Sequence, residues 1–298
     1  MKRKIIKQGA GGCTIFLPIK WVRKNSLYSG KEVEVTELDN NLIVSSPEKK
    51  NEKIKRVLLE NGDSNSQINL LIGSTYRAGY SSTIVSFNQK TSLSNISEIV
   101  NNYTGLEITN QTVNEITIKS FLNNEKEEVE NLIVKMFQIT NTIVNEIDIE
   151  WEKIDFKKLE IMKNNIIKVG EHTLRTIHLN NYGEEKSYDY YDLVTQIQKI
   201  SSDLTNLCNY YYKEKIEKTT LINKLKTKFG DIYHSYLKKN FQESSEVWIT
   251  QYSELHEDFS PDKFNELIKV NDPIMVLYYH KIIERYSNIA SRILSISI

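Results

Sequence analysis

The stretch IIKQGAGGCTIFLPIKWVRKNSLYSGKEVEVTELDNNLIV, residues 5–44, decides the fold of the first part of the chain. Apolar residues form a run at Thr14–Leu17, alternate with charged residues at Glu32–Glu37, and return at Asn41–Val44. A repeat of two is typical of β-strands, and the Asp39-Asn40 step between the last two runs suits a tight hairpin. We therefore expect a strand, a glycine loop and a second strand, followed by a hairpin.

A short basic helix is expected between these two strand pairs, because Pro18 suits a first helical position and the pattern continues to about Asn25. No acidic residue occurs in the first 24 positions. Seven cations occur there: Lys2, Arg3, Lys4, Lys7, Lys20, Arg23 and Lys24. Since the formal net charge of the whole chain is zero, the remainder is net acidic. This asymmetry predicts a site for a polyanion near the N-terminus.

The bulk composition fits two or three domains with cores of their own. The chain has 298 residues, of which 39% are hydrophobic and 26% charged. Two cysteines, Cys13 and Cys208, give neither a disulfide framework nor metal-ligand spacing, which favours a reducing, cytoplasmic setting. No apolar run approaches the roughly 20 residues that cross a bilayer, so no membrane insertion is expected.

The periodicity divides the chain into three predicted domains at residues 1–47, 54–122 and 123–298, which together make a multidomain α+β protein. Residues 54–122 read as a small β-α-β-α-β-β unit. From residue 123 onward, apolar residues recur in steps of three and four, as in helical bundles. We expect six main helices in two three-helix halves, at about 123–149, 153–180, 188–215, 218–243, 246–269 and 273–297. Ser260-Pro261 is expected to start a short segment that interrupts the helix before it, and Asp272-Pro273 marks the start of the last helix.

The N-terminal segment resembles the SpoVT/AbrB swapped-hairpin domain, which also occurs in MazE-type antitoxins. The residues that carry the likeness are Lys7-Gln8-Gly9, Thr14-Ile15-Phe16-Leu17-Pro18, Lys20-Trp21-Val22, Leu27, Gly30–Val35 and Leu42-Ile43-Val44. The resemblance implies a homodimer through residues 1–46, in which hairpins of two chains interleave into one β-barrel. It also implies contact with double-stranded DNA through basic residues of the first strand and loop. With the cations of the short helix included, the candidate DNA-binding residues are Arg3, Lys4, Lys7, Gln8, Lys20, Arg23 and Lys24.

The rest of the chain is similar to archaeal PhoU-like proteins, in which such a domain precedes a helical bundle. The likeness is carried by Tyr76–Tyr80, Gly105–Ile108, Gln198–Asp203 and Ile282–Ala290. It implies phosphate homeostasis and a divalent-metal or iron cluster held by acidic motifs. Here Asn288 and Lys199 stand where acids belong, so no metal site is predicted, and Glu284 and Asp203 are the remaining candidate ligands.

These features predict a cytoplasmic, dimeric transcriptional regulator of phosphate uptake whose bundle senses a signal or docks a partner. No phosphate-binding loop, nucleophile elbow or dinucleotide fingerprint occurs, so neither an enzyme nor catalytic residues are expected. One alternative is a PhoU-type interaction protein that regulates a phosphate transporter, for example through its ATPase, without binding DNA. Another is an antitoxin-like protein of the AbrB/MazE type.

Overall fold

The computed structural model of the chain describes residues 2–9, 11–38, 41–46, 53–60, 64–87, 93–122, 128–147, 153–215 and 220–298. The chain divides into two compact units, Met1–Glu52 and Lys53–Ile298, each of which is described by itself. The predicted boundary between an α/β domain and a bundle falls inside the second unit.

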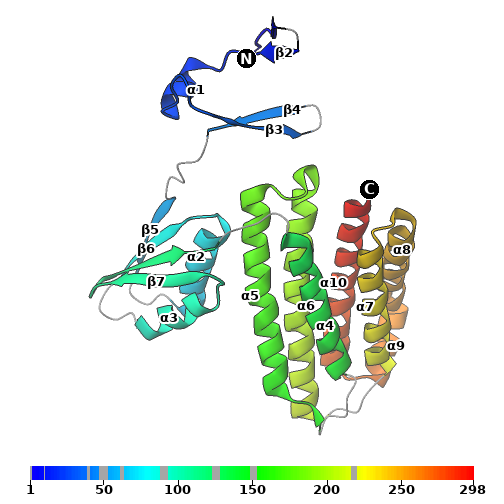
Figure 1. Cartoon of the computed structure of the whole chain (residues 1–298). Helices are drawn as coiled ribbons and strands as arrows, with labels where there is room; N and C mark the ends of the chain where they lie inside the picture. Colours follow the sequence, from blue (N-terminus) through cyan, green and yellow to red (C-terminus); the bar gives the residue numbers. More distant parts are fainter. Residues whose placement is uncertain are drawn as a thin grey trace. The chain divides into compact units, whose positions relative to one another are not determined.

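The first unit, which we call the head, contains two antiparallel hairpins and one short helix (Figure 1). Its elements are β1 (Ile6–Gln8), β2 (Gly12–Thr14), α1 (Ile19–Lys24), β3 (Glu34–Leu38) and β4 (Asn41–Ser45). The hairpin of β3 and β4 confirms the alternation seen in the sequence, and the turn residues 39–40 lie outside the described part. The strand expected at Thr14–Leu17 is wrong for residues 15–17, because among the described strands β2 pairs only with β1, and this ladder ends at Thr14.

The second unit begins with the predicted β-α-β-α-β-β order, which the structure confirms. The elements are β5 (Ile54–Leu59), α2 (Asn65–Arg77), β6 (Ser82–Phe87), α3 (Leu93–Asn101), β7 (Leu106–Gln111) and β8 (Glu115–Ser120). The strand order is β5-β6-β8-β7, in which β5 runs parallel to β6 and the other pairs are antiparallel. One face of each helix packs against the sheet in one hydrophobic core, while Leu70 and Leu71 of α2 remain exposed.

Helix α2 starts and ends where its sequence specifies. Ser64 and Gln67 form a capping box, in which each side chain accepts a hydrogen bond from the backbone N–H of the other residue. Ile68, Ile72 and Tyr76 form the buried face that packs in the core. The helix stops before Gly79, whose φ of 77° lies in the left-handed region that favours glycine.

The remaining residues form a helical bundle, as predicted, and the short segment expected from Ser260-Pro261 is a separate helix beside the six main ones. The described part contains seven α-helices: α4 (Glu128–Ile147), α5 (Phe156–Asn180), α6 (Ser187–Glu214), α7 (Thr220–Lys238), α8 (Phe241–Asp258), α9 (Pro261–Val270) and α10 (Pro273–Ser297). A short 3₁₀ turn, η2 (Glu184–Lys186), precedes α6.

Local capping explains why some helices of the bundle begin and end at other residues than predicted. Lys239 adopts a left-handed φ of 49°, and the Asn240 side chain accepts the N–H of Glu243, so α7 ends and α8 begins several residues earlier than expected. The predicted helix 246–269 is two helices because Pro261 cannot donate the backbone hydrogen bond that would continue α8. Asp272 caps α10 and Pro273 occupies its first turn, as the sequence predicted.

The bundle has one continuous hydrophobic core. Helices α4, α5 and α6 pack on one another, and α7, α8 and α10 form a second mutually packed group. Contacts of α10 with α6, and of α4 with α7, join the two groups. Helix α9 buries no residue. No helix among the described residues is both long enough and apolar enough to cross a membrane.

Candidate nucleic-acid interface

All seven residues expected to contact DNA lie in the head and are exposed to solvent. Lys7 and Gln8 belong to β1, and Arg3 and Lys4 directly precede it. Lys20, Arg23 and Lys24 lie on α1. None of the six cations forms an ion pair with an acidic residue in the part of the chain that the structure describes. Exposed cations without an internal partner are available to neutralise phosphate groups.

The first hairpin holds Lys7 and Gln8 in a defined register. Ile6 pairs with Thr14, Lys7 with Cys13 and Gln8 with Gly12, and the Thr14 hydroxyl donates to Gln8 Oε1 at 2.5 Å. Gly9 turns the chain after β1 with a φ of 66°, which a residue with a Cβ rarely adopts. The Gln8 amide group, whose oxygen is held by Thr14, still has its N–H donors for a phosphate or a base edge.

Helix α1 carries two of its cations where its own dipole favours them. Arg23 and Lys24 occupy the last turn, and the C-terminal end of a helix is its negative end. The Asn25 side chain donates to the carbonyl of Trp21 at 2.8 Å and closes this end.

The described residues of the head lack a buried apolar core. Large apolar side chains that a stable domain would cover are exposed: Ile5, Ile6, Ile15, Phe16, Ile19, Tyr28, Val35, Leu42 and Ile43. Phe16 is 65% exposed and Leu42 is 69% exposed. The hairpins form two separate two-stranded sheets, and within one chain no closed barrel is formed by the described residues. A unit of this length rarely has a sufficient hydrophobic core of its own, and an exposed apolar surface of this kind is typical of interaction sites.

The two candidate metal ligands lie in different surroundings in the bundle. Asp203 on α6 is buried and accepts hydrogen bonds from Lys281 Nζ at 2.6 Å and Arg285 Nε at 3.0 Å, both on α10. Glu284 is exposed on α10. Among the described residues, no cluster of three or more histidine, cysteine, aspartate or glutamate side chains could hold a metal ion. Two of the four segments that carry the PhoU likeness, Gln198–Asp203 and Ile282–Ala290, meet through the ion pair between Asp203 and Arg285.

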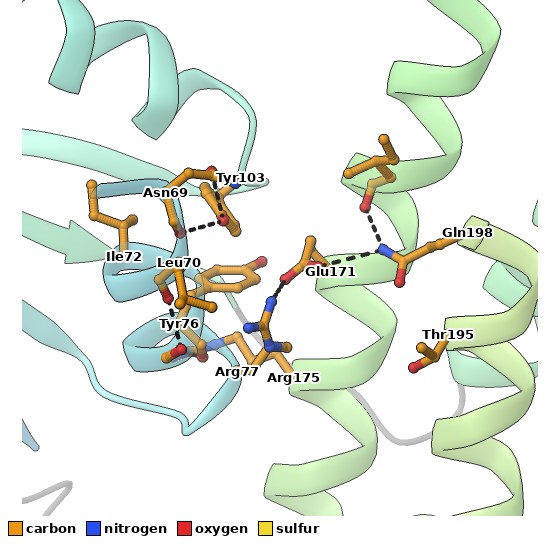
Figure 2. A network of polar contacts seen from close by, with 12 residues as sticks. Asn69, Leu70, Ile72, Tyr76, Arg77, Tyr103, Glu171, Arg175, Thr195 and Gln198 are labelled. Atoms are coloured by element: carbon orange, nitrogen blue, oxygen red, sulfur yellow. Dashed lines mark hydrogen bonds and ion pairs between the residues drawn. The ribbon is translucent and has the colours of Figure 1, made fainter. Parts of the chain in front are cut away.

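A polar junction that the sequence patterns did not reveal joins the α/β part to the bundle. Arg77 of α2 forms an ion pair of 2.6 Å with Glu171 of α5, and Gln198 of α6 donates to the other Glu171 oxygen at 3.5 Å (Figure 2). Arg175 of α5 is buried and donates to the carbonyls of Tyr76 and Tyr80. Its guanidinium also lies 4.9 Å from the centre of the Tyr76 ring. The sequence offers one indication of this junction: Glu171 and Arg175 are charged residues next to buried positions of a long amphipathic helix.

His172 lies on α5 between Glu171 and the buried Arg175 and predicts a pH dependence of stability. Burial lowers the pKa of His172, the nearby Glu128 opposes this shift, and Arg175 adds to it. The folded state therefore binds this proton less readily than the unfolded chain, which takes it up below about pH 6.5. The contribution of His172 to the free energy of unfolding is fully present above that pH. It decreases as the pH falls, by at most about 1.4 kcal/mol per pH unit.

We expect His172→Gln to flatten the decrease in the free energy of unfolding between pH 7 and pH 5, measured by urea denaturation. His178→Gln, which removes an exposed histidine from the same helix, is the matched control. If the free energy of unfolding decreased equally with pH in the wild type and in His172→Gln, the lowered pKa of His172 would not be the cause.

No protein-family model matches the chain, and neither a curated protein nor a solved structure is significantly similar to it.

Proposed function

We propose that the protein is a homodimeric DNA-binding transcriptional regulator. Residues 1–46 of two chains interleave into one barrel of the swapped-hairpin type, and the cations at the start of each chain bind the phosphates of double-stranded DNA. One observation carries the proposal: the head combines exposed cations near its N-terminus with large apolar side chains that the other described residues of the head leave exposed. A second head covers the apolar residues and doubles the cations.

The same proposal assigns the bundle to the regulation of phosphate uptake, in the cytoplasm, by sensing a signal or docking a transporter ATPase. It is supported by the likeness of Gln198–Asp203 and Ile282–Ala290 to PhoU segments and by the ion pair of Asp203 with Arg285 that brings these segments together. Since Lys281 and Arg285 already donate hydrogen bonds to the Asp203 carboxylate, the proposal includes no metal cluster.

The salt dependence of DNA binding tests the head. If Lys4 and Lys7 of both chains contact phosphates, Lys4→Glu/Lys7→Glu removes four contacts, each of which contributes about 0.9 to the slope of log affinity against log salt. We therefore expect the double variant to bind a short mixed-sequence duplex more weakly and with a slope lower by about 3 to 4, measured by fluorescence anisotropy at increasing salt.

The matched control is Lys135→Glu/Lys199→Glu, which makes the same charge change on exposed positions of α4 and α6. It should leave the slope unchanged. Wild-type binding that is absent or independent of salt would refute DNA binding. If a transporter ATPase then co-purified with both the wild type and the Lys4/Lys7 variant, the interaction protein would replace the regulator, and co-purification of a toxin would favour the antitoxin-like protein.

Mapping of bound DNA across the genome, in phosphate-replete and phosphate-starved cells, tests the regulated process. We expect binding sites near genes of phosphate uptake, with occupancy that changes between the two conditions. Occupancy that is identical in both conditions would refute the phosphate assignment while leaving DNA binding intact.

A further inference from the structure

A cleft of about 550 Å³ lies between the α/β part and the bundle, within the second unit. Helix α2, the segment after α3 and helix α5 line this junction cleft. Its lining residues are Ser66, Asn69, Leu70, Arg77, Asn102, Tyr103, Asn164, Ile167 and Glu171. The volume falls in the range of small-molecule sites in proteins.

The lining offers one cation and one anion side by side. Arg77 and Glu171 form their 2.6 Å pair there, and their side chains are only 25% and 13% exposed. A guanidinium has five N–H donors and a carboxylate has about four acceptor sites, so both groups keep capacity for a ligand while they remain paired. The two charges together favour a ligand that carries both signs.

A glycine in the middle of α2 makes this arrangement possible. A Cβ at position 73 would lie 2.4 Å from the Tyr103 hydroxyl and 3.2 Å from Arg77 Nη1. A glycine inside a helix costs about 1 kcal/mol relative to alanine, so Gly73 has to be explained by the close approach of these two side chains. Asn69 fixes the position of the Tyr103 hydroxyl, because this hydroxyl donates a hydrogen bond to Asn69 Oδ1 at 3.0 Å (Figure 2).

The rest of the lining suits the side chain of a small ligand. Ser66, Asn102 and Asn164 present a hydroxyl and two amides, while Leu70 and Ile167 present apolar surface. A phosphate ion would meet the Glu171 carboxylate, and a polyamine would meet the Arg77 guanidinium, so each is opposed by one member of the pair. A zwitterion satisfies both.

We propose that the junction cleft binds a free amino acid, whose carboxylate accepts hydrogen bonds from Arg77 and whose ammonium group donates to Glu171. The ligand would touch α2 and α5 at once, so its binding strengthens the contact between the α/β part and the bundle. This inference goes beyond the proposed function, because binding is measured on the chain without DNA and holds whether or not the head binds DNA.

Isothermal titration of the full chain with each common L-amino acid in turn tests the proposal. We expect saturable binding of at least one of them. The best ligand is then titrated as its carboxamide, which lacks the carboxylate, and as its N-acetyl form, which lacks the ammonium group. Each change should weaken binding by about tenfold or more, as should Arg77→Gln and Glu171→Gln.

Because Arg77 and Glu171 also join α2 to α5, two further variants separate ligand binding from folding. Asn102→Trp and Ser66→Trp place a large side chain at exposed lining positions and should abolish binding without lowering the thermal unfolding midpoint. Asn131→Trp on the exposed face of α4 is the control and should bind normally.

Three outcomes would overturn the proposal. The first is the absence of binding of any amino acid at millimolar concentration. The second is affinity that survives both tryptophan variants. The third is binding of inorganic phosphate that Glu171→Gln strengthens, which would identify an anion site instead.

Discussion

Replacing Phe16 by aspartate is expected to turn the proposed dimer into a monomer and to reduce the proposed affinity for DNA at least a hundredfold. Phe16 is 65% exposed in the single chain, within the segment that the swapped-hairpin arrangement would cover. Burying one phenylalanine contributes about 1.5–3 kcal/mol, and the twofold symmetry of a dimer makes the loss occur twice. A lost contribution of about 3–6 kcal/mol raises the dissociation constant by two to four orders of magnitude.

The carboxylate adds to this effect, because it would also be removed from water at the interface. Analytical ultracentrifugation measures the dimer constant, and fluorescence anisotropy measures the DNA affinity. Val270→Asp, at a residue of α9 that is 79% exposed, is the matched control and should remain dimeric. A Phe16→Asp protein that still sedimented as the wild-type dimer would refute the interleaved head. Loss of DNA binding by such a dimer would place Phe16 at the DNA surface instead.

The second large effect is expected at Asp203, where breaking a buried charge pair should destabilise the bundle by about 2–4 kcal/mol. The Asp203 side chain is 6% exposed, and its partners Arg285 and Lys281 are 20% and 48% exposed. Asp203→Leu leaves the partly buried Arg285 without its carboxylate, and Arg285→Met leaves a buried carboxylate with only the more exposed lysine. We place the expected cost below that of a fully buried pair because water reaches Lys281.

A double-mutant cycle distinguishes this explanation from a packing defect. If unpaired charge is the cause, Asp203→Leu/Arg285→Met should recover at least half of the stability lost by either single variant, measured by urea denaturation. The exposed Glu284→Leu is the control and should change the free energy of unfolding by about 0.5 kcal/mol or less. Additive losses would refute the coupling. A wild-type unfolding midpoint that rose with added divalent metal and fell with a chelator would revive Asp203 as a metal ligand.

The sequence predicted most of the elements of the second unit, because their signals are local. The stripe at Ile68, Ile72 and Tyr76 has the helical period, and Gly79 closes that helix in a conformation that few other residues adopt. Similarly, the Asp272-Pro273 pair predicted the start of α10 because both residues act on the backbone of the first turn.

Other features escaped prediction because they depend on partners far away in the chain. Arg77 and Glu171 are separated by 94 positions, and no periodic pattern on either helix identifies the other. The PhoU-like motif that ends at Asp203 makes this residue a candidate metal ligand, whereas its neighbours in space are cations 78 and 82 positions away. The strand expected at residues 15–17 failed for a related reason, since a strand needs a partner and the apolar run alone does not provide one.

The core shared by both groups of bundle helices has a consequence for how the protein unfolds. Because α10 packs against α6 as well as α7 and α8, removing it would uncover apolar surface in both groups at once. Neither group of three helices is therefore an independent folding unit, and the bundle should lose its structure in a single cooperative transition. Amide hydrogen exchange should accordingly protect the buried faces of α6 and α10 to the same extent, while the little-packed α9 exchanges first.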